Sequence, residues 1–395
     1  MILLALAALT AAHAAAVSPR SPAHAAAIAR CTAGHKDACG PALTETGRAF
    51  LLESGAERPE DLAAAEKACA LGVPVGCALF GTAEFRAART PAESAAGRKL
   101  VDKACAAKNE IACSIEATLL LGGDAAERSR GRPLLDKTCE ASKKLSCVVL
   151  AGMLASGDLA GVVRDQGRAF QLDARACEAG EVAGCRSAGY ALHEGVGAAR
   201  DLGRAAAFYG KSCEGGDGYG CSDLGLMALA GEGVPRDPAR AEAAFRRGCE
   251  LGEREGCRNF SAAAHAGTLG PTNSPGLFEI DSVACNGGAS AACLYLFQRY
   301  AHGDGVPQSD DKAVSFVGRA CQFGDTAGCE LGAKMNGAAR TKCAANDLGG
   351  CYLLALTQLY GVGTAVDGAT ARTLLNALCA KGAKPACDKF ATLGP

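Results

Sequence analysis

The side chains of this sequence best suited to chemistry are its twenty-two cysteines, which form eleven pairs of the type Cys-x7-Cys. Successive pairs begin thirty-four to thirty-eight residues apart, with one shorter interval, and no cysteine is left over. The pairs are Cys31 with Cys39, Cys69 with Cys77, Cys105 with Cys113, Cys139 with Cys147, Cys177 with Cys185, Cys213 with Cys221, Cys249 with Cys257, Cys285 with Cys293, Cys321 with Cys329, Cys343 with Cys351, and Cys379 with Cys387.

Disulfide formation is the chemistry that this spacing favours. Structural zinc sites commonly use closely spaced Cys-x2-Cys ligands, and the sequence contains no such spacing. Paired cysteines at this frequency are typical of proteins that fold in an oxidising compartment. We therefore predict one disulfide within each pair.

A disulfide between residues i and i+8 constrains the backbone. Two residues eight apart in one continuous helix lie about 12 Å apart, whereas a disulfide needs Cα atoms roughly 4.4–6.8 Å apart. The helix must therefore end between the two cysteines. Each bridge is predicted to join the end of one helix to the first turn of the next.

The segment Cys213–Cys249 shows the predicted repeat unit most clearly. Leucines and a methionine from Cys221 to about Ala230 predict a first helix, which we call helix A. A glycine-rich stretch ends it, and Asp237 followed by Pro238 provides an N-cap and a first residue for a second helix, helix B. Gly252 is placed to end helix B in a left-handed turn.

Repetition of this unit predicts an all-α solenoid in which each repeat contacts mainly its neighbours. Between Cys321 and Cys343 the interval is only twenty-two residues, so this unit is truncated. Two alternatives are open there: a kink at Met335–Gly337 or a short bridging helical turn. The predicted parts are a signal peptide (1–25), an N-terminal capping repeat (26–68), the array (69–320), the truncated repeat (321–342) and a C-terminal repeat with cap (343–395).

Charge and hydropathy narrow the class of partner. Forty-one basic and forty-two acidic residues leave a formal net charge of −1, which does not favour nucleic acid or an anionic membrane surface. The apolar run Ile2–Ala16 is too short to span a bilayer and ends in small residues, as a signal peptide does, with cleavage between about 16 and 25. The sequence predicts an exported protein, periplasmic or secreted, with no membrane span.

The frame of a cysteine, Leu-Gly, Gly-x-Gly-Val and then Asp resembles the Sel-one-like repeat (SLR) family, with Glu232–Asp237 and Gly303–Asp310 as the best matches. With its cysteine pairs, the chain is most similar to the Helicobacter cysteine-rich protein type. The resemblance implies a right-handed superhelix of TPR-like (tetratricopeptide-like) helix pairs with one disulfide per repeat, outside the cytoplasm. It also implies one of two functions: an adaptor whose concave face binds protein or peptide, or a penicillin-binding protein or weak β-lactamase.

Catalytic motifs are weak in this sequence. The single Ser-x-x-Lys, Ser309 to Lys312, lies where an N-cap is expected, and the partner motifs of serine β-lactamases are absent. The six histidines are scattered and none forms His-x3-His. We predict no catalytic residue, no metal and no cofactor.

A binding surface is the remaining hypothesis. The ends of the A helices in the middle and late repeats carry aromatic and polar groups suited to peptide recognition. These residues are Tyr190, His193, Glu194, Arg299, Tyr300, His302, Gln358 and Tyr360. The leading prediction is a non-catalytic scaffold for a protein or peptide; the alternatives are a β-lactam-binding or weakly hydrolytic protein, and an envelope adaptor that binds cell-wall glycan such as peptidoglycan.

Overall fold

The computed structural model describes residues 22–52, 59–157, 163–269 and 276–393, so most of the predicted signal peptide lies outside the described residues. The described residues form helices and no strand. They divide into two compact units, one comprising residues 1–227 and 231–235 and the other residues 228–230 and 236–395. This division lies inside the predicted array 69–320.

Unit 1 contains the first twelve described helices, the last of which ends at the boundary between the units. They are α2 (Pro22–Thr32), α3 (Lys36–Leu52), α4 (Pro59–Ala70), α5 (Pro74–Ala87), α6 (Pro91–Ala106), α7 (Glu110–Leu121), α8 (Ala125–Ser142), α9 (Leu145–Ser156), α10 (Gln166–Glu178), α11 (Val182–Glu194), α12 (Leu202–Glu214) and α13 (Gly218–Ala230).

Unit 2 contains the remaining nine described helices. They are α14 (Pro238–Glu250), α15 (Arg254–His265), α16 (Leu277–Asn286), α17 (Ser290–His302), α18 (Asp310–Gln322), α19 (Thr326–Ala344), α20 (Leu348–Tyr360), α21 (Gly368–Ala380) and α22 (Lys384–Thr392). The all-α prediction is confirmed.

Every predicted cysteine pair is joined by a disulfide, with Cα–Cα distances of 4.3–4.8 Å. The helix ends between the two cysteines each time, as the distance argument requires. In unit 1 the bridges join Cys31 to Cys39, Cys69 to Cys77, Cys105 to Cys113, Cys139 to Cys147, Cys177 to Cys185, and Cys213 to Cys221. In unit 2 they join Cys249 to Cys257, Cys285 to Cys293, Cys321 to Cys329, Cys343 to Cys351, and Cys379 to Cys387.

The capping signals also take the predicted positions in the unit used for the prediction. Helix B is α14 there, and the Asp237 side chain accepts a hydrogen bond from the Arg240 amide as its N-cap. Gly252 follows with φ +83°, the left-handed conformation that favours glycine. Both ends of this helix B are therefore determined by adjacent residues.

The truncated unit takes a form that differs from both alternatives raised by the sequence. Residues 326–344 form one continuous helix, α19, which replaces both a helix A and a helix B. Its buried Asn336 donates a hydrogen bond to Thr357 Oγ1 of α20 (2.9 Å) and accepts one from Arg340 Nε. Helices α18 and α20 contact each other directly, so α18, α19 and α20 pack as a three-helix group.

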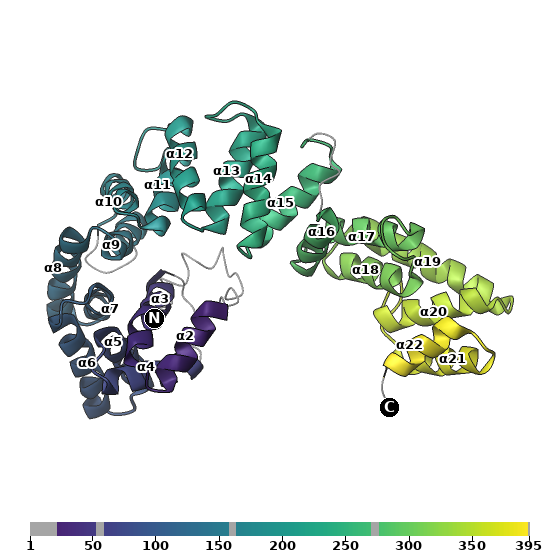
Figure 1. Cartoon of the computed structure of the whole chain (residues 1–395), viewed down its shortest axis with the longest axis horizontal. Helices are drawn as coiled ribbons and strands as arrows, with labels where there is room; N and C mark the ends of the chain where they lie inside the picture. The colour runs from purple at the N-terminus through teal and green to yellow at the C-terminus, as the bar shows by residue number, and fades with distance from the viewer. Residues whose placement is uncertain (1–21, 53–58, 158–162, 270–275, 394–395) are drawn as a thin grey trace. The chain divides into compact units, whose positions relative to one another are not determined.

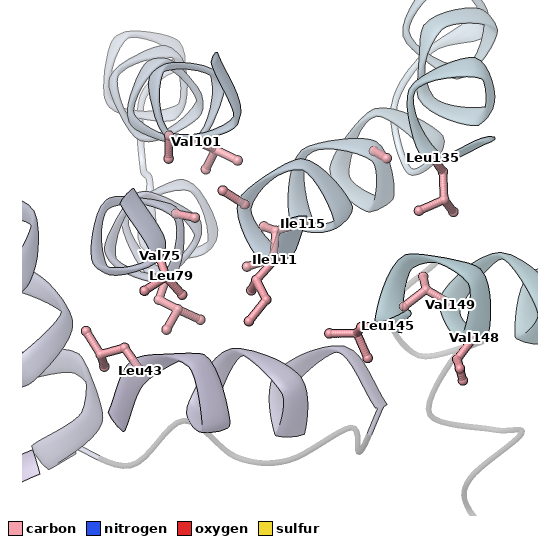
Figure 2. Packing of buried hydrophobic residues seen from close by; sticks show 14 of the residues in the cluster. Leu43, Val75, Leu79, Val101, Ile111, Ile115, Leu135, Leu145, Val148 and Val149 are labelled. Atoms are coloured by element: carbon pink, nitrogen blue, oxygen red, sulfur yellow. The ribbon is translucent and has the colours of Figure 1, made fainter. Parts of the chain in front are cut away.

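In unit 1 the A helices α5, α7, α9 and α11 lie on the inner side of the curve and the B helices α6, α8 and α10 on the outer side (Figure 1). The core lies between these two layers and on the inner side, where Val75, Ile111 and Leu145 point towards α3 (Figure 2). α3 lies inside the curve and contacts α5, α7 and α9.

One position of helix B contributes a buried side chain to the core of each repeat. The residue four positions before the first cysteine of a pair, which we call the core register, is buried in every described repeat after the first pair. Its occupants are Ala65, Val101, Leu135, Asp173, Tyr209, Phe245, Asp281, Val317, Ala339 and Leu375. Eight are apolar or aromatic, and two are aspartates.

Small residues allow helices A and B to approach closely, as at Gly81 of α5 and Gly97 of α6. A Cβ on Gly81 would lie 2.6 Å from the Gly97 carbonyl oxygen, and a Cβ on Gly97 would lie 2.6 Å from the Gly81 carbonyl oxygen. Both neighbours are backbone atoms and cannot rotate away. Gly152 of α9, in contrast, has open space around its Cβ position.

This contrast gives a matched pair of substitutions. Gly81→Ala should lower the free energy of unfolding by about 1–3 kcal/mol, because the helices must separate. Gly152→Ala should raise it by about 0.5–1 kcal/mol, because alanine is the better helix former. Urea unfolding followed by far-UV circular dichroism measures both; equal effects would contradict the close packing.

Candidate functional site

The residues predicted to form a binding surface fall into both units. Tyr190, His193 and Glu194 belong to α11 in unit 1. The others, Arg299, Tyr300, His302, Gln358 and Tyr360, belong to α17 and α20 in unit 2. The predicted residues therefore form two groups, one in each unit.

In unit 1 the predicted residues form a local polar group. His193 Nδ1 lies 2.7 Å from Glu194 Oε1, and its Nε2 lies 3.5 Å from Glu232 Oε2. The His193 ring packs edge-on against Tyr209, with centroids 6.4 Å apart. Tyr190 is 56% exposed and is the one aromatic ring of this group open to a partner.

In unit 2 two of the predicted tyrosines pack the interior. Tyr300 is buried and stacks on Phe316 with ring centroids 5.8 Å apart. Tyr360 donates a hydrogen bond to Asp311 Oδ1 (2.7 Å) and accepts one from Lys389 Nζ (2.7 Å). These two rings stabilise unit 2 and offer little surface to a ligand.

The Tyr360 group fastens the last helix, α22, to α18. Lys389 Nζ also lies 2.8 Å from Asp311 Oδ1. Burial raises the pKa of the Tyr360 hydroxyl. Burial alone would lower the pKa of the Lys389 ammonium, but its hydrogen bonds to Asp311 and Tyr360 outweigh that effect and raise the pKa. The pair therefore remains a neutral phenol and a charged ammonium near pH 7.

The remaining predicted residues differ in exposure. His302 is exposed at the end of α17, whereas Gln358 of α20 is half-buried with its Oε1 atom lacking a hydrogen-bond partner in the described structure. Arg299 lines an open pocket of about 440 Å³ in unit 2. Of the eight predicted residues, Arg299 is the one that lines this pocket.

The pocket lies where α15 meets α17 and the loop that follows α17. Its wall is formed by His265, Tyr295, Gln298, Arg299, Asp304 and Gly305. Tyr295 and Arg299 are four residues apart on α17 and therefore lie on one face of that helix. The His265 ring stacks on the Tyr295 ring with centroids 3.4 Å apart and an interplanar angle of 15°.

Asp281, at the core register of α16, orients the histidine. Its carboxylate is fully buried and accepts hydrogen bonds from Ser261 Oγ (2.7 Å) and His265 Nε2 (3.0 Å). A buried carboxylate is costly unless its oxygen atoms are paired. Ser261 and His265 pair it and, in return, Asp281 holds the imidazole against Tyr295.

Asp173 occupies the core register of α10 in unit 1, where no equivalent of Ser261 or His265 is present to donate a hydrogen bond to its carboxylate. It is 8% exposed, and its Oδ1 atom has no hydrogen-bond partner. The positions of α9 that correspond to Ser261 and His265 hold Ala151 and Ala155, whose side chains cannot donate. Burial therefore raises the pKa of the Asp173 carboxyl well above its usual range.

Two charged groups face the pocket without an ion pair. Among the described residues, neither the Arg299 guanidinium nor the Asp304 carboxylate is joined to an oppositely charged side chain. Together with the stacked rings and the exposed Gln298 amide, they offer an aromatic face, a cation, an anion and a hydrogen-bonding group. This combination suits the main chain and side chains of a polypeptide.

The serine of the Ser-x-x-Lys motif has a structural role. Ser309, of the Ser-x-x-Lys motif, accepts a hydrogen bond from the Lys312 amide as the N-cap of α18, so its capping interpretation is confirmed. No group of three or more His, Cys, Asp or Glu side chains in the described ranges could hold a metal ion. No described helix is long and apolar enough to cross a membrane.

Sequence reasoning missed His265, Tyr295, Gln298 and Asp304, which line the pocket, and Asp281, which supports it. A signal was present: Asp281 breaks the apolar pattern of the core register, and Ser261 and His265 precede it in the adjacent helix A at positions that pack against that register. Comparing registers between repeats would have identified this support.

A family model for the Sel1 repeat matches residues 145–181, 182–217, 218–253, 290–325 and 349–382. The chain contains Sel1 repeats over these five stretches. The matches omit residues 1–144, the stretch 254–289 that contains α15 and α16, and the stretch 326–348 that contains α19. Sel1 repeats build helical scaffolds that typically mediate protein interactions.

One solved structure supports this fold, and two others show weaker similarity. A protective antigen of uropathogenic Escherichia coli that displays an SLR fold is 20% identical, with a TM-score of 0.53, over 94% of this chain and 82% of that protein. A Sel1-repeat protein from Oxalobacter formigenes is 18% identical, with a TM-score of 0.49, over 88% and 93%. Helicobacter pylori cysteine-rich protein B is 28% identical, with a TM-score of 0.28, over 34% and 97%. No curated protein sequence matches the chain significantly.

The two buried aspartates give a second matched pair of substitutions. Asp173→Leu should raise the free energy of unfolding by about 1–3 kcal/mol, because an unpaired buried carboxyl is replaced by the leucine found at Leu135. Asp281→Leu should lower it by about 1–3 kcal/mol for each partner left unpaired.

The pH dependence checks the cause. The folded-state pKa of Asp173 lies above the unfolded value, so the contribution of this carboxyl to the free energy of unfolding falls as pH rises above about 4. The gain from Asp173→Leu should therefore be larger at pH 7 than at pH 4, measured by urea unfolding at both. A gain that does not change with pH would contradict the raised pKa.

Proposed function

We propose that this protein is an exported, non-catalytic scaffold that binds a polypeptide through the pocket surface of unit 2. The observation that carries the proposal is the open pocket walled by His265, Tyr295, Arg299 and Asp304. A solenoid contributes an extended surface, and an aromatic pocket with few charges gives that surface an anchor point.

The chemistry of the pocket supports a polypeptide as the ligand. The stacked His265 and Tyr295 rings provide a rigid apolar face for a side chain. Arg299 can bind a carboxylate or a main-chain carbonyl, and Asp304 can accept from an amine or an amide. Because the hydrogen bond from His265 to the buried Asp281 fixes the orientation of the imidazole ring, the aromatic wall of the pocket is preorganised for the ligand.

Export is supported by the disulfides, which are typical of proteins that fold in an oxidising compartment. Helix α2 begins at Pro22, and His24 is 6% exposed with its Nδ1 atom 2.8 Å from Glu45 Oε2. Cleavage after Ala25 would remove this contact, whereas cleavage near Ala16 keeps it. We therefore expect any signal cleavage to fall in the early part of the predicted range, where it would keep this contact.

Peptide selection tests the binding function. A random peptide library displayed on phage is selected against the oxidised full-length protein, and binding of the selected peptides is measured by fluorescence polarisation. Arg299→Ala and Tyr295→Ala should each weaken binding at least tenfold. Arg247→Ala, an exposed arginine of α14, is the matched control and should leave binding unchanged. Peptides that bind all three variants equally would contradict the pocket assignment.

The thiol state tests export. Protein recovered from the periplasm or the medium should contain no free thiol, and non-reducing peptide mass spectrometry should show eleven links between residues i and i+8. Each short loop closed by a disulfide stabilises on the order of 2–3 kcal/mol, so reduction should unfold the chain. Free thiols throughout the protein recovered from its native host would contradict an oxidising location.

A further inference from the structure

One disulfide of unit 1 has a cation against its sulfur atoms. The Arg175 guanidinium of α10 donates from Nη2 to Cys139 Sγ (2.9 Å), and the same nitrogen lies 3.5 Å from Cys147 Sγ. In the described part of the chain, no other disulfide sulfur accepts a hydrogen bond from an arginine or a lysine. The bridge joins α8 to α9, and α9 packs against α10, so the arginine reaches it from the next repeat (Figure 1).

The position of Arg175, two residues before the first cysteine of its own pair, is basic in six other repeats. Its basic occupants there are Lys67, Lys103, Lys137, Lys211, Arg247 and Arg319. Arg319 also reaches the preceding bridge, but it donates to the Cys285 carbonyl oxygen (3.5 Å) and not to sulfur. Arg247 pairs with Glu250 of its own helix. Contact with sulfur is therefore specific to Arg175 and is not a general feature of the repeat.

The Arg175 guanidinium has one counter-charge, and that charge is in water. Nη1 pairs with Glu140 Oε1 (2.9 Å), whose side chain is 66% exposed, and Nε is buried without a hydrogen-bond partner. Water screens the charge of Glu140, whereas Cys139 and Cys147 are fully buried. A positive charge stabilises a thiolate more than a neutral disulfide. Arg175 therefore shifts the equilibrium between this bridge and its reduced form towards the reduced form.

The turn between these two cysteines is held by contacts other than the disulfide. Glu110 of α7, in the preceding repeat, accepts hydrogen bonds from Ser142 Oγ (2.7 Å), the Ser146 amide (2.9 Å) and Ser146 Oγ (2.9 Å). Hydrogen bonds to a carboxylate are among the stronger ones in proteins. They keep the turn in place when the bridge is open, so the two cysteines stay close enough to form the same bridge again.

We propose that Cys139–Cys147 is a thiol-exchange site that a dithiol reduces reversibly. A thiolate of the dithiol attacks Cys147 Sγ and forms a mixed disulfide, while the bond between the two cysteines breaks and Cys139 leaves with the electron pair as a thiolate beside Arg175. The second sulfur of the dithiol then attacks the first, which completes the disulfide of the oxidised partner and releases Cys147. Two electrons pass to the bridge, one proton passes to Cys147 and one to solvent.

A redox titration of the full-length oxidised protein tests this equilibrium. The protein is equilibrated with mixtures of reduced and oxidised dithiothreitol, quenched with acid, alkylated differentially and analysed by peptide mass spectrometry. The equilibrium constant for reduction of Cys139–Cys147 should be at least tenfold larger than that of Cys105–Cys113, a difference of about 30 mV. Backbone strain is matched in this comparison, because both turns hold a lysine with positive φ, Lys143 at 56° and Lys108 at 59°.

Substitutions separate the charge from the packing. Arg175→Gln should remove the difference between the two bridges, and Arg175→Lys should retain part of it. Glu140→Gln, which removes the counter-charge, should raise the equilibrium constant of Cys139–Cys147 several-fold. Arg247→Gln, in the same register, is the matched control and should change neither bridge. Equal constants in the wild type, or a difference that survives Arg175→Gln, would overturn the proposal. If Arg175→Gln does not fold, an unchanged constant in Glu140→Gln overturns it instead.

Glutathione tests the direction of attack and the reversibility. The mixed disulfide expected at low glutathione concentration is on Cys147, with Cys139 free for alkylation, and removal of glutathione should restore the original link. An adduct confined to Cys139 would contradict the role given to Arg175. Loss of hydrogen-exchange protection throughout α8 and α9 on reduction of this one bridge would contradict reversible exchange. The site lies in unit 1, so neither result depends on the unit 2 pocket.

Discussion

A disulfide between cysteines eight residues apart is possible only where the helix carrying the first cysteine has ended. This distance limit places a tight turn at every bridge and therefore a reversal of chain direction in every repeat. Most of these turns use a glycine with positive φ, and three use Lys108, Lys143 and Asn346 instead. The bridge holds the turn even where the residue is unfavourable, so the relation of each helix B to the following helix A stays constant along the chain.

That constant relation gives each register a fixed environment. The core register is buried in repeat after repeat, so a polar residue there must find partners or remain unpaired. Asp281 finds Ser261 and His265, and the pocket against Tyr295 depends on this pairing. The Oδ1 atom of Asp173 finds no partner, and burial raises the pKa of this carboxyl. The disulfides on both sides of this repeat offset the destabilisation caused by the unpaired carboxyl.

The features that the sequence predicted are local ones. Cysteine spacing, the Asp237-Pro238 start of helix B and the left-handed Gly252 each depend on a few adjacent residues, and all three are present in the structure. The continuous α19 was not predicted, because residues 326–344 contain Asn336-Gly337, a pair that can end a helix, although they contain no proline. There the deletion removes the loop and leaves helix-compatible sequence behind.

The pocket and the packing of α3 could not be predicted from local sequence patterns, because the residues that contact each other there are distant in the sequence. Arg48 and Glu181 are separated by 133 residues, and no local pattern in either segment indicates the other. Stacking of His265 on Tyr295 depends on how α15 and α17 pack against each other. Propensity and spacing determine the repeats, whereas these contacts are determined by the curvature of the assembled unit.

These distant contacts also change how the solenoid responds to stress. A repeat array in which only neighbours touch has a stability that is approximately a sum over repeats, and it can open from either end. In unit 1, Arg48 joins the first described repeat to the N-terminus of α11, and in unit 2, Lys389 joins the last helix to Asp311 of α18. Opening an end repeat therefore breaks contacts to a distant repeat as well as to its neighbour. Unfolding of each unit is therefore more cooperative than in an array in which only adjacent repeats touch. The disulfides keep the turns closed in whichever repeat unfolds first.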